Sequence, residues 1–181
     1  MTDQEPLGIQ QATPALAVAD ADADADFSSF YRSFIATLAG FLVWQGASAA
    51  IAAELAQETM IEALRAWPRI EHPAAWARRT ASRKLVRHHS SIVEDPVDPV
   101  PETTALVSFW DGLADWENRQ TLRDLFQHLP PRQRQMLAWT VAGYTPAQIA
   151  EELALDSSVV RANLMKARRA AARFLTAQEE A

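Results

Sequence analysis

Apolar side chains recur every three or four positions in several stretches of the chain, which is the period of an amphipathic α-helix. The longest pattern follows Asp26, a candidate N-cap, and consists of Phe27, Phe30, Tyr31, Phe34, Ile35, Leu38, Phe41 and Leu42. A second helical stretch covers residues 47–67 and ends before Pro68, and a third covers residues 73–89. We therefore predict a three-helix unit over residues 26–90.

A second helical unit is predicted over residues 117–176. The Pro130–Pro131 pair separates its first two helices, and Gly143 ends the second. Residues 145–148, Thr-Pro-Ala-Gln, have the composition of a capping box and begin a short helix. The turn at residues 154–156 leads to a last helix with arginine and lysine on its outer face. This is a helix-turn-helix pattern, which is typical of DNA-binding proteins but also occurs in other helical hairpins.

The segments outside these units are polar or acidic. Residues 1–25 end in an alanine–aspartate repeat with nothing bulky to bury, so we expect a disordered acidic tail. Residues 91–116 contain three prolines among acidic residues, which predicts an extended linker, and residues 177–181 form a short tail. The predicted fold class is all-α, with two small helical domains joined by an extended acidic linker.

Composition supports this interpretation and excludes several others. The chain has 181 residues, of which 49% are hydrophobic, with only 5 glycines and no cysteine. Without cysteine there is neither a disulfide nor a thiolate zinc site. The first residues lack the basic and apolar segments of a secretory signal, and the longest apolar stretch, residues 34–44, is about half of what a membrane helix needs. We expect a cytoplasmic protein that does not insert into a membrane.

The net charge of −6 hides a strong segregation of charge. Residues 61–90 carry seven bases and two acids, and residues 129–177 carry seven bases and three acids. Residues 1–60 and 91–128 carry eight acids each. Two basic surfaces that face anions are the simplest explanation, and the acidic tail and linker are candidate competitors for those surfaces.

The helix over residues 47–67 has two different sides. The residues that can face a core are Ile51, Leu55, Met60, Ala63, Leu64 and Trp67. The opposite arc is polar except for one apolar member, and its residues are Glu54, Gln57, Glu58, Ile61 and Arg65. An isoleucine within a polar arc is typical of a protein-docking face, although a solvated helix face has the same composition.

The next helix carries a row of bases. Arg79, Arg83 and Arg87 are spaced four apart, and Trp76 lies on the adjoining side. Arginines beside an aromatic ring suit a nucleic-acid backbone and an unstacked base, and a solvated basic face is the alternative. His88 and His89 are adjacent and point about 100° apart, so they form no chelating pair. We expect no metal and no cofactor.

Three stretches carry a family resemblance in a fixed order. They are ELAQETMIEALRAW at 54–67, HPAAWARRTASR at 72–83 and LPPRQRQMLAWTVAGYTPAQIAEELALDSSVVRANLMKARRAAARFL at 129–175. Together they resemble the extracytoplasmic-function (ECF) sigma factors of bacterial RNA polymerase, with region 2 at about 27–90 and region 4 at about 117–176.

The resemblance implies a partner for each face. Core RNA polymerase would be bound through the clamp helices of its largest subunit, at Glu54, Gln57, Glu58 and Ile61, and through the flap of its second-largest subunit. Promoter DNA would be bound at the minus-ten element by Trp76, Arg79, Arg83 and Arg87, with residues 68–72 as the pocket for a flipped base. The residues implied for the minus-thirty-five element are Arg132, Arg134, Ser157, Ser158, Arg161, Ala162, Lys166, Arg168 and Arg169. An anti-sigma factor is a further partner that the sequence leaves open.

Some positions depart from the pattern of the family. Asparagine is usual where Arg83 stands, aspartate is frequent at Arg87, and residues 158–162 read Ser-Val-Val-Arg-Ala instead of Gly-Thr-Val-Lys-Ser. Ala154 replaces the usual turn glycine, which implies strain if that position needs a positive φ.

Three other functions are alternatives to a sigma factor. One is a helix-turn-helix regulator that binds DNA but not the polymerase core, and another is an interaction protein that has kept the fold without binding DNA. An enzyme is the least supported, because the sequence has no glycine-rich phosphate loop and no nucleophile or metal-ligand spacing.

Overall fold

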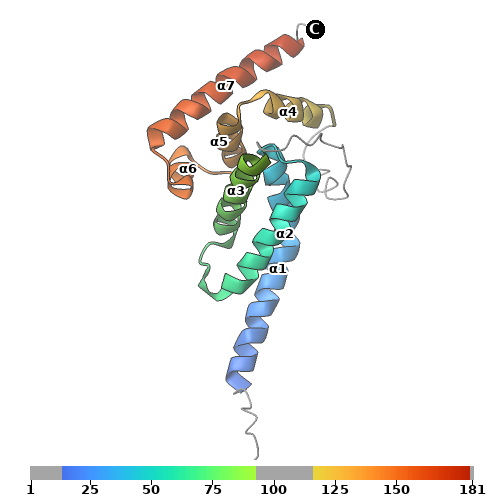
Figure 1. The fold of residues 1–181 in the computed structure, drawn as a ribbon, viewed down its shortest axis with the longest axis vertical. Coiled ribbons are helices and arrows are strands. Elements are labelled where there is room, and N and C mark those ends of the chain that lie inside the picture. The colour runs from blue at the N-terminus through green and yellow to red at the C-terminus, as the bar shows by residue number, and fades with distance from the viewer. Residues whose placement is uncertain (1–13, 93–115, 180–181) are drawn as a thin grey trace, which may run out of the picture.

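The computed structural model describes residues 14–92 and 116–179, and all of its regular elements there are helical (Figure 1). In chain order they are α1 (Pro14–Trp44), α2 (Ala49–Ala66), the 3₁₀ turn η1 (Trp67–Arg69), α3 (Pro73–Ile92), α4 (Trp116–His128), α5 (Pro131–Val141), α6 (Pro146–Leu153) and α7 (Ser157–Glu179). The all-α prediction is confirmed for the described part of the chain.

Helix α1 begins at Pro14 and not at Asp26. The alanine–aspartate repeat is therefore helical over residues 14–25, where the sequence predicts disorder, and its turns project beyond the other helices (Figure 1). Alanine is the best helix former, so the alanines of the repeat favour the helix, although the first turn of α1 contains no acidic residue. The rest of the predicted tail (1–13) and most of the predicted linker (93–115) lie outside the described residues.

Helices α1, α2 and α3 form a bundle with small residues at its contacts. Leu38, Leu42 and Met60 are almost fully buried, and Ala52, Ala56, Ala77 and Ala81 lie between them with no exposed surface. Alanine at a helix contact lets two backbones approach closely, so the larger side chains can interlock around it. The side chain of Ser48 caps α2 by accepting from the backbone N–H of Ile51 at 3.3 Å.

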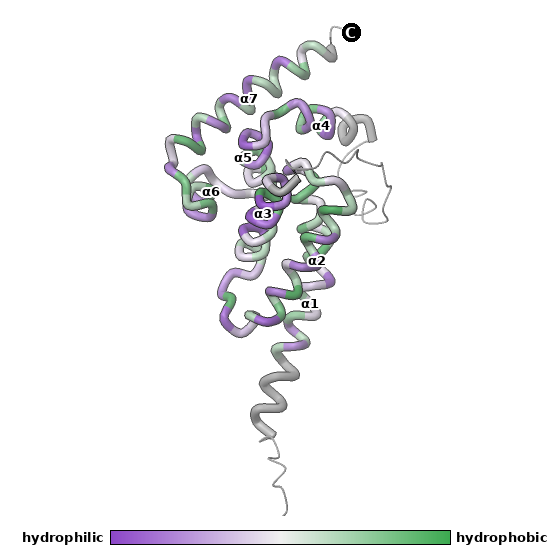
Figure 2. The backbone as a smooth tube through the Cα atoms, viewed as in Figure 1, coloured by the Kyte–Doolittle hydropathy of each residue, from purple (hydrophilic) through white to green (hydrophobic). Residues whose placement is uncertain are grey.

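Helices α4 to α7 form the second group. Trp139 of α5 is fully buried, as are Ile149 of α6 and Val160 of α7. The capping box predicted at residues 145–148 is present and begins α6. Hydrophobic and hydrophilic segments alternate along α7 in Figure 2, as expected for a helix that buries one side only.

The two groups share one hydrophobic core. Helix α5 contacts α1, and α6 contacts α3, so the second group lies against the C-terminal half of α1 and against α3 (Figure 1). The rings of Phe41 of α1 and Trp139 of α5 meet edge to face, with their centroids 5.3 Å apart. The ring centroids of Trp44 of α1 and Phe126 of α4 are 4.5 Å apart. We call these contacts, together with those that α3 makes with α6 and with Tyr144 between α5 and α6, the seam.

Candidate functional surfaces

The docking face predicted on α2 is exposed and continuous. Glu54, Gln57 and Glu58 are all exposed, and Ile61 keeps 50% of its surface accessible. Leu64, which the sequence groups with the core, is instead 47% exposed one turn beyond Ile61. Leu64 lies outside the buried side of α2, which Met60 and Ala63 occupy. The face is therefore more apolar than the sequence predicts.

The polar members of this face are held by neighbouring helices. Gln57 Nε2 donates to the Tyr31 hydroxyl at 3.1 Å, which joins α2 to α1. Lys84 Nζ of α3 lies 2.7 Å from Glu58 Oε2 and 2.8 Å from Glu62 Oε1. Burial lowers the pKa of Lys84, but its hydrogen bonds to the two glutamates outweigh burial and raise that pKa above its ordinary value. These contacts fix the polar side chains of the face where the sequence predicts docking.

Two arginines of the basic row on α3 face solvent, and the third contacts α6 at the seam. Arg83 and Arg87 are exposed, and Trp76 is half-buried against the bundle core. Arg79 is different, because its Nη1 lies 3.4 Å from Glu152 Oε2 of α6. The structure thus places the four predicted minus-ten residues on one helix but leaves only part of the row open to a ligand.

Arg78, which lies beside this row, is a seam residue that the sequence does not single out. Its guanidinium carbon lies 4.8 Å from the Phe34 ring centroid and 5.6 Å from that of Tyr144, and its Nη1 donates to the Tyr144 hydroxyl at 3.4 Å. These contacts join α1 and α3 to the segment between α5 and α6. No periodic pattern marks such a pairing, since the partners are far apart in the sequence.

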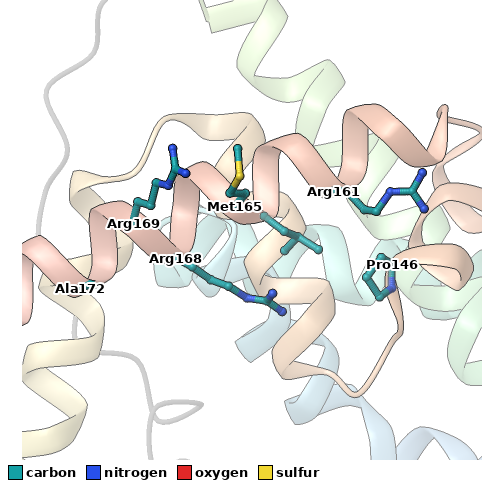
Figure 3. Close-up of a pocket in the computed structure, with 7 residues that line it drawn as sticks. Pro146, Arg161, Met165, Arg168, Arg169 and Ala172 are labelled. Atoms are coloured by element: carbon teal, nitrogen blue, oxygen red, sulfur yellow. The ribbon is translucent and has the colours of Figure 1, made fainter.

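The outer face of α7 is basic and open. Arg161, Lys166, Arg168 and Arg169 are exposed, and Met165 is 46% exposed among them. A shallow groove of about 600 Å³ lies between α7 and Pro146 at the start of α6, and Arg161, Arg168 and Arg169 line it (Figure 3). Arg168 and Arg169 point to opposite sides of α7, so together they reach across its outer surface. A basic, exposed helix of this kind suits a groove of duplex DNA.

The N-terminus of α7 is fixed by an aspartate. Asp156 Oδ1 accepts a hydrogen bond from the backbone N–H of Ser158 at 2.7 Å. Hydrogen bonding to the Ser158 side chain, and next to it the backbone bond, holds the pKa of Asp156 below its ordinary value. Ser157, Ser158 and Ala162 follow in the first turns, where the resemblance places base contacts. Ala154 ends α6 in the left-handed region at φ 51°, so the strain predicted there is confirmed.

The two arginines predicted as backbone contacts differ in their surroundings. Arg132 is exposed, and its Nη1 donates to Gln135 Oε1 at 3.1 Å. Arg134 Nη2 donates to the carbonyls of Gln127 and Leu129 at 3.0 Å each, and so caps the C-terminal end of α4. Burial lowers the pKa of Arg134. The structure gives Arg134 a helix-capping position, and its contact with DNA stays a prediction.

Within residues 14–92 and 116–179, no cluster of three metal-ligating side chains occurs. No helix in the same part of the chain combines the length and the apolar character needed to cross a bilayer.

Two family models match the chain, the sigma-70 region 2 over residues 30–91 and the sigma-70 region 4 over residues 119–170. The chain belongs to the sigma-70 family. The region 4 model is the type found in ECF sigma factors, so the resemblance drawn from the sequence is confirmed. A comparison with curated protein sequences gives no match.

The fold of this sigma factor is similar to a solved structure, the sigma factor RpoE in complex with the anti-sigma factor NepR from Bartonella quintana. The TM-score is 0.66 at 16% identity, and the similarity covers 83% of this chain and 97% of RpoE. In this sigma factor, region 2 corresponds to the C-terminal half of α1 together with α2 and α3, and region 4 corresponds to α4–α7.

Proposed function

We propose that this ECF sigma factor directs core RNA polymerase to its promoters through three surfaces: the docking face of α2, the basic row of α3 and the outer face of α7. The observation that carries the proposal is that the docking face, with Ile61 exposed among fixed polar groups, lies on a different helix from either basic face. A factor that binds a protein and DNA together needs such separate surfaces.

Promoter opening is assigned to α3. Extruding a base from a duplex costs a few kcal/mol, and stacking it on an aromatic side chain returns about 1–3 kcal/mol per base. Trp76 and residues 68–72 are the proposed stacking site, while Arg79, Arg83 and Arg87 neutralise the strand backbone. Arginine at positions 83 and 87 makes this contact more electrostatic than the family pattern implies.

Duplex recognition at the minus-thirty-five element is assigned to region 4. We place base contacts at Ser157, Ser158, Arg161 and Ala162 in the first turns of α7, and backbone contacts at Lys166, Arg168 and Arg169 farther along. Arg132 and Arg134 remain proposed backbone contacts on α5. Bond formation belongs to the polymerase, so the sigma factor itself is proposed to perform no catalysis.

Other partners and location follow from the same function. The flap of the second-largest polymerase subunit is the proposed partner of region 4, and promoter DNA is the ligand of both basic faces. Because RpoE was solved with an anti-sigma factor, an anti-sigma factor is also proposed as a partner here. The proposed location is the cytoplasm, where promoter DNA and polymerase are found.

Binding to core polymerase without DNA tests the proposal. Ile61→Glu places a charge at the centre of the docking face on an exposed position, so it should leave the fold intact but abolish co-elution with core polymerase in gel filtration. The matched control is Val86→Glu, which changes a 54% exposed residue of α3 outside this face and should co-elute like the wild type. If the wild type itself does not co-elute, or if Ile61→Glu binds as well as Val86→Glu, the polymerase-docking assignment is wrong.

The alternative function is a helix-turn-helix regulator without polymerase binding. The same experiment separates the two, because a regulator gains nothing from affinity for the core enzyme in the absence of DNA. No observation on the described residues favours this alternative over an initiation factor.

A further inference from the structure

The exposed face of α7 contains a row of apolar side chains. Val159 is 42% exposed and Met165 is 46% exposed, and Ala162 lies exposed between them. Because these residues are three apart, each is displaced from the one before by about 60° around the helix and about 4.5 Å along its axis. Together they form a slanting row about 9 Å long, which we call the apolar strip.

Positive charge lies on both sides of the apolar strip. Arg161 directly precedes Ala162 and Lys166 directly follows Met165, so the two bases are displaced by about 100° from the strip in opposite directions. Both are exposed, and Figure 3 shows Met165 on α7 between Arg161 and Arg169. Such charges attract the phosphates that border a groove of duplex DNA, and they bring the strip to the base edges between them.

The short polar side chains beside the strip make hydrogen bonds within the protein. The backbone N–H and the hydroxyl of Ser158 both bond to Asp156. Asn163 Nδ2 donates to the carbonyl of Val159 at 2.8 Å. These groups hold the first turns of α7, whereas the side chains of the apolar strip face solvent.

Two members of the strip are apolar where the family pattern has a hydroxyl. Val159 stands in place of threonine, and Ala162 stands in place of serine. Valine and threonine have nearly the same size and similar helix propensities, so this exchange at an exposed position gives the fold little. It changes the surface instead, because a hydroxyl can hydrogen-bond to a base edge while a methyl group makes only apolar contact.

Thymine is the base that offers such a contact, since its C5-methyl group is the apolar feature of the major groove. Building on the proposed function of region 4, we propose that Val159, Ala162 and Met165 read thymine methyl groups. The strip of about 9 Å spans two to three base pairs at about 3.4 Å each. The minus-thirty-five element of this sigma factor therefore contains two or three neighbouring thymines.

The test begins with the selection of a binding site. The full chain, alone and with core polymerase, enriches duplexes from a random pool, and the enriched duplex is expected to contain neighbouring thymines. It is then synthesised with deoxyuridine, which lacks only the C5-methyl group, at one thymine at a time. Affinity should fall about two- to fourfold at each thymine that contacts the strip, as expected for one buried methyl group, and should be unchanged at the others.

Variants of the strip connect this preference to its side chains. Val159→Thr and Met165→Gln each introduce a polar group of similar size at an exposed position. Each should bind the thymine and deoxyuridine forms equally at the position that it contacts. The matched control is Leu175→Gln, which changes a 44% exposed residue of α7 beyond the strip and should keep the wild-type preference. Any effect of deoxyuridine on the shape of DNA is the same for all these proteins.

Each outcome decides one point. If the wild type binds the thymine and deoxyuridine forms equally at every position, the inference fails, while the minus-thirty-five assignment stands because a selected duplex is bound. If the preference for thymine persists in both Val159→Thr and Met165→Gln, other residues read the methyl group and the inference also fails. If no duplex is enriched with or without core polymerase, the minus-thirty-five assignment of the proposed function fails together with the inference.

Discussion

Ala154 shows how one backbone angle limits stability. It occupies the left-handed region at φ 51° between the two helices of the helix-turn-helix. An L-residue with a Cβ pays roughly 1–2 kcal/mol there relative to glycine, while glycine loses somewhat more chain entropy on folding. The fold keeps the strain because α6 and α7 are fixed on both sides of the turn.

We predict that Ala154→Gly raises the free energy of unfolding by about 1 kcal/mol, because relief of the strain exceeds the added chain entropy. Urea denaturation followed by circular dichroism measures the change. The control is Ala172→Gly on the exposed side of α7, where the same substitution should lower the free energy of unfolding by about 1 kcal/mol. Equal signs for the two variants would contradict the strain at position 154.

The strain at this residue could be predicted from the sequence, whereas the role of Arg134 could not. Ala154 stands where a turn between two recognisable helices needs a positive φ, so local pattern was sufficient. In the sequence, nothing distinguishes Arg134 from other basic residues near the start of a helix. In the structure, it donates to the carbonyls of Gln127 and Leu129 and lies against Gly46 of region 2. Its surroundings depend on how the regions pack.

At the scale of elements, helix starts and stops were the most predictable feature. Pro68, the Pro130–Pro131 pair, Gly143 and the capping box at 145–148 all act where the sequence places them. The start of α1 was not predicted, because the alanine–aspartate repeat has no apolar side that would give a periodic signal. The repeat is helical because alanine has a high helix propensity and because the amphipathic part of α1 continues the same helix.

The cap of α7 makes a prediction about pH. The pKa of Asp156 is held below its ordinary value of 3.8 in the folded protein by hydrogen bonds from the side chain and the backbone of Ser158. Because the folded pKa is lowered, the stabilisation is fully present above the ordinary value and is lost as pH falls below it through the folded pKa. Asp156→Asn should therefore be less stable than the wild type at neutral pH, and the difference should shrink in acid.

Urea denaturation of both proteins at about pH 7 and about pH 3 measures this effect. The matched control is Asp24→Asn at an exposed position of α1, a charge-removing change away from the start of α7, which should not reproduce the same pH-dependent difference. A gap between wild type and Asp156→Asn that is independent of pH would show that the charge on Asp156 does not stabilise α7.

At the scale of the whole molecule, the sequence predicted two domains and an acidic linker but not the seam. The acidic tail and linker were the candidate competitors for the basic faces, yet in the described residues it is Glu152 of α6 that meets Arg79. Seam partners such as Phe41 and Trp139 lie in different regions and fit the helical period of their own elements. Their meeting depends on the packing of two complete bundles, which no local pattern encodes.

Gly46 offers a direct measure of that packing. It ends α1 at φ 103°, and a Cβ built on it would overlap the guanidinium of Arg134. Gly143 ends α5 at φ 92°, and a Cβ there would meet nothing within 4 Å. Alanine at either position incurs the cost of a positive φ, about 1–2 kcal/mol, but only alanine at position 46 must also displace the Arg134 guanidinium from the carbonyls of Gln127 and Leu129.

We predict that Gly46→Ala lowers the free energy of unfolding more than Gly143→Ala does, because the added methyl group displaces the Arg134 guanidinium. Because the extra loss comes from one contact, it should disappear in an Arg134→Ala background, where Gly46→Ala and Gly143→Ala become equivalent. Urea denaturation of the single and double variants gives the coupling between positions 46 and 134. A coupling of zero would contradict the contact between Gly46 of region 2 and Arg134 of region 4 in solution.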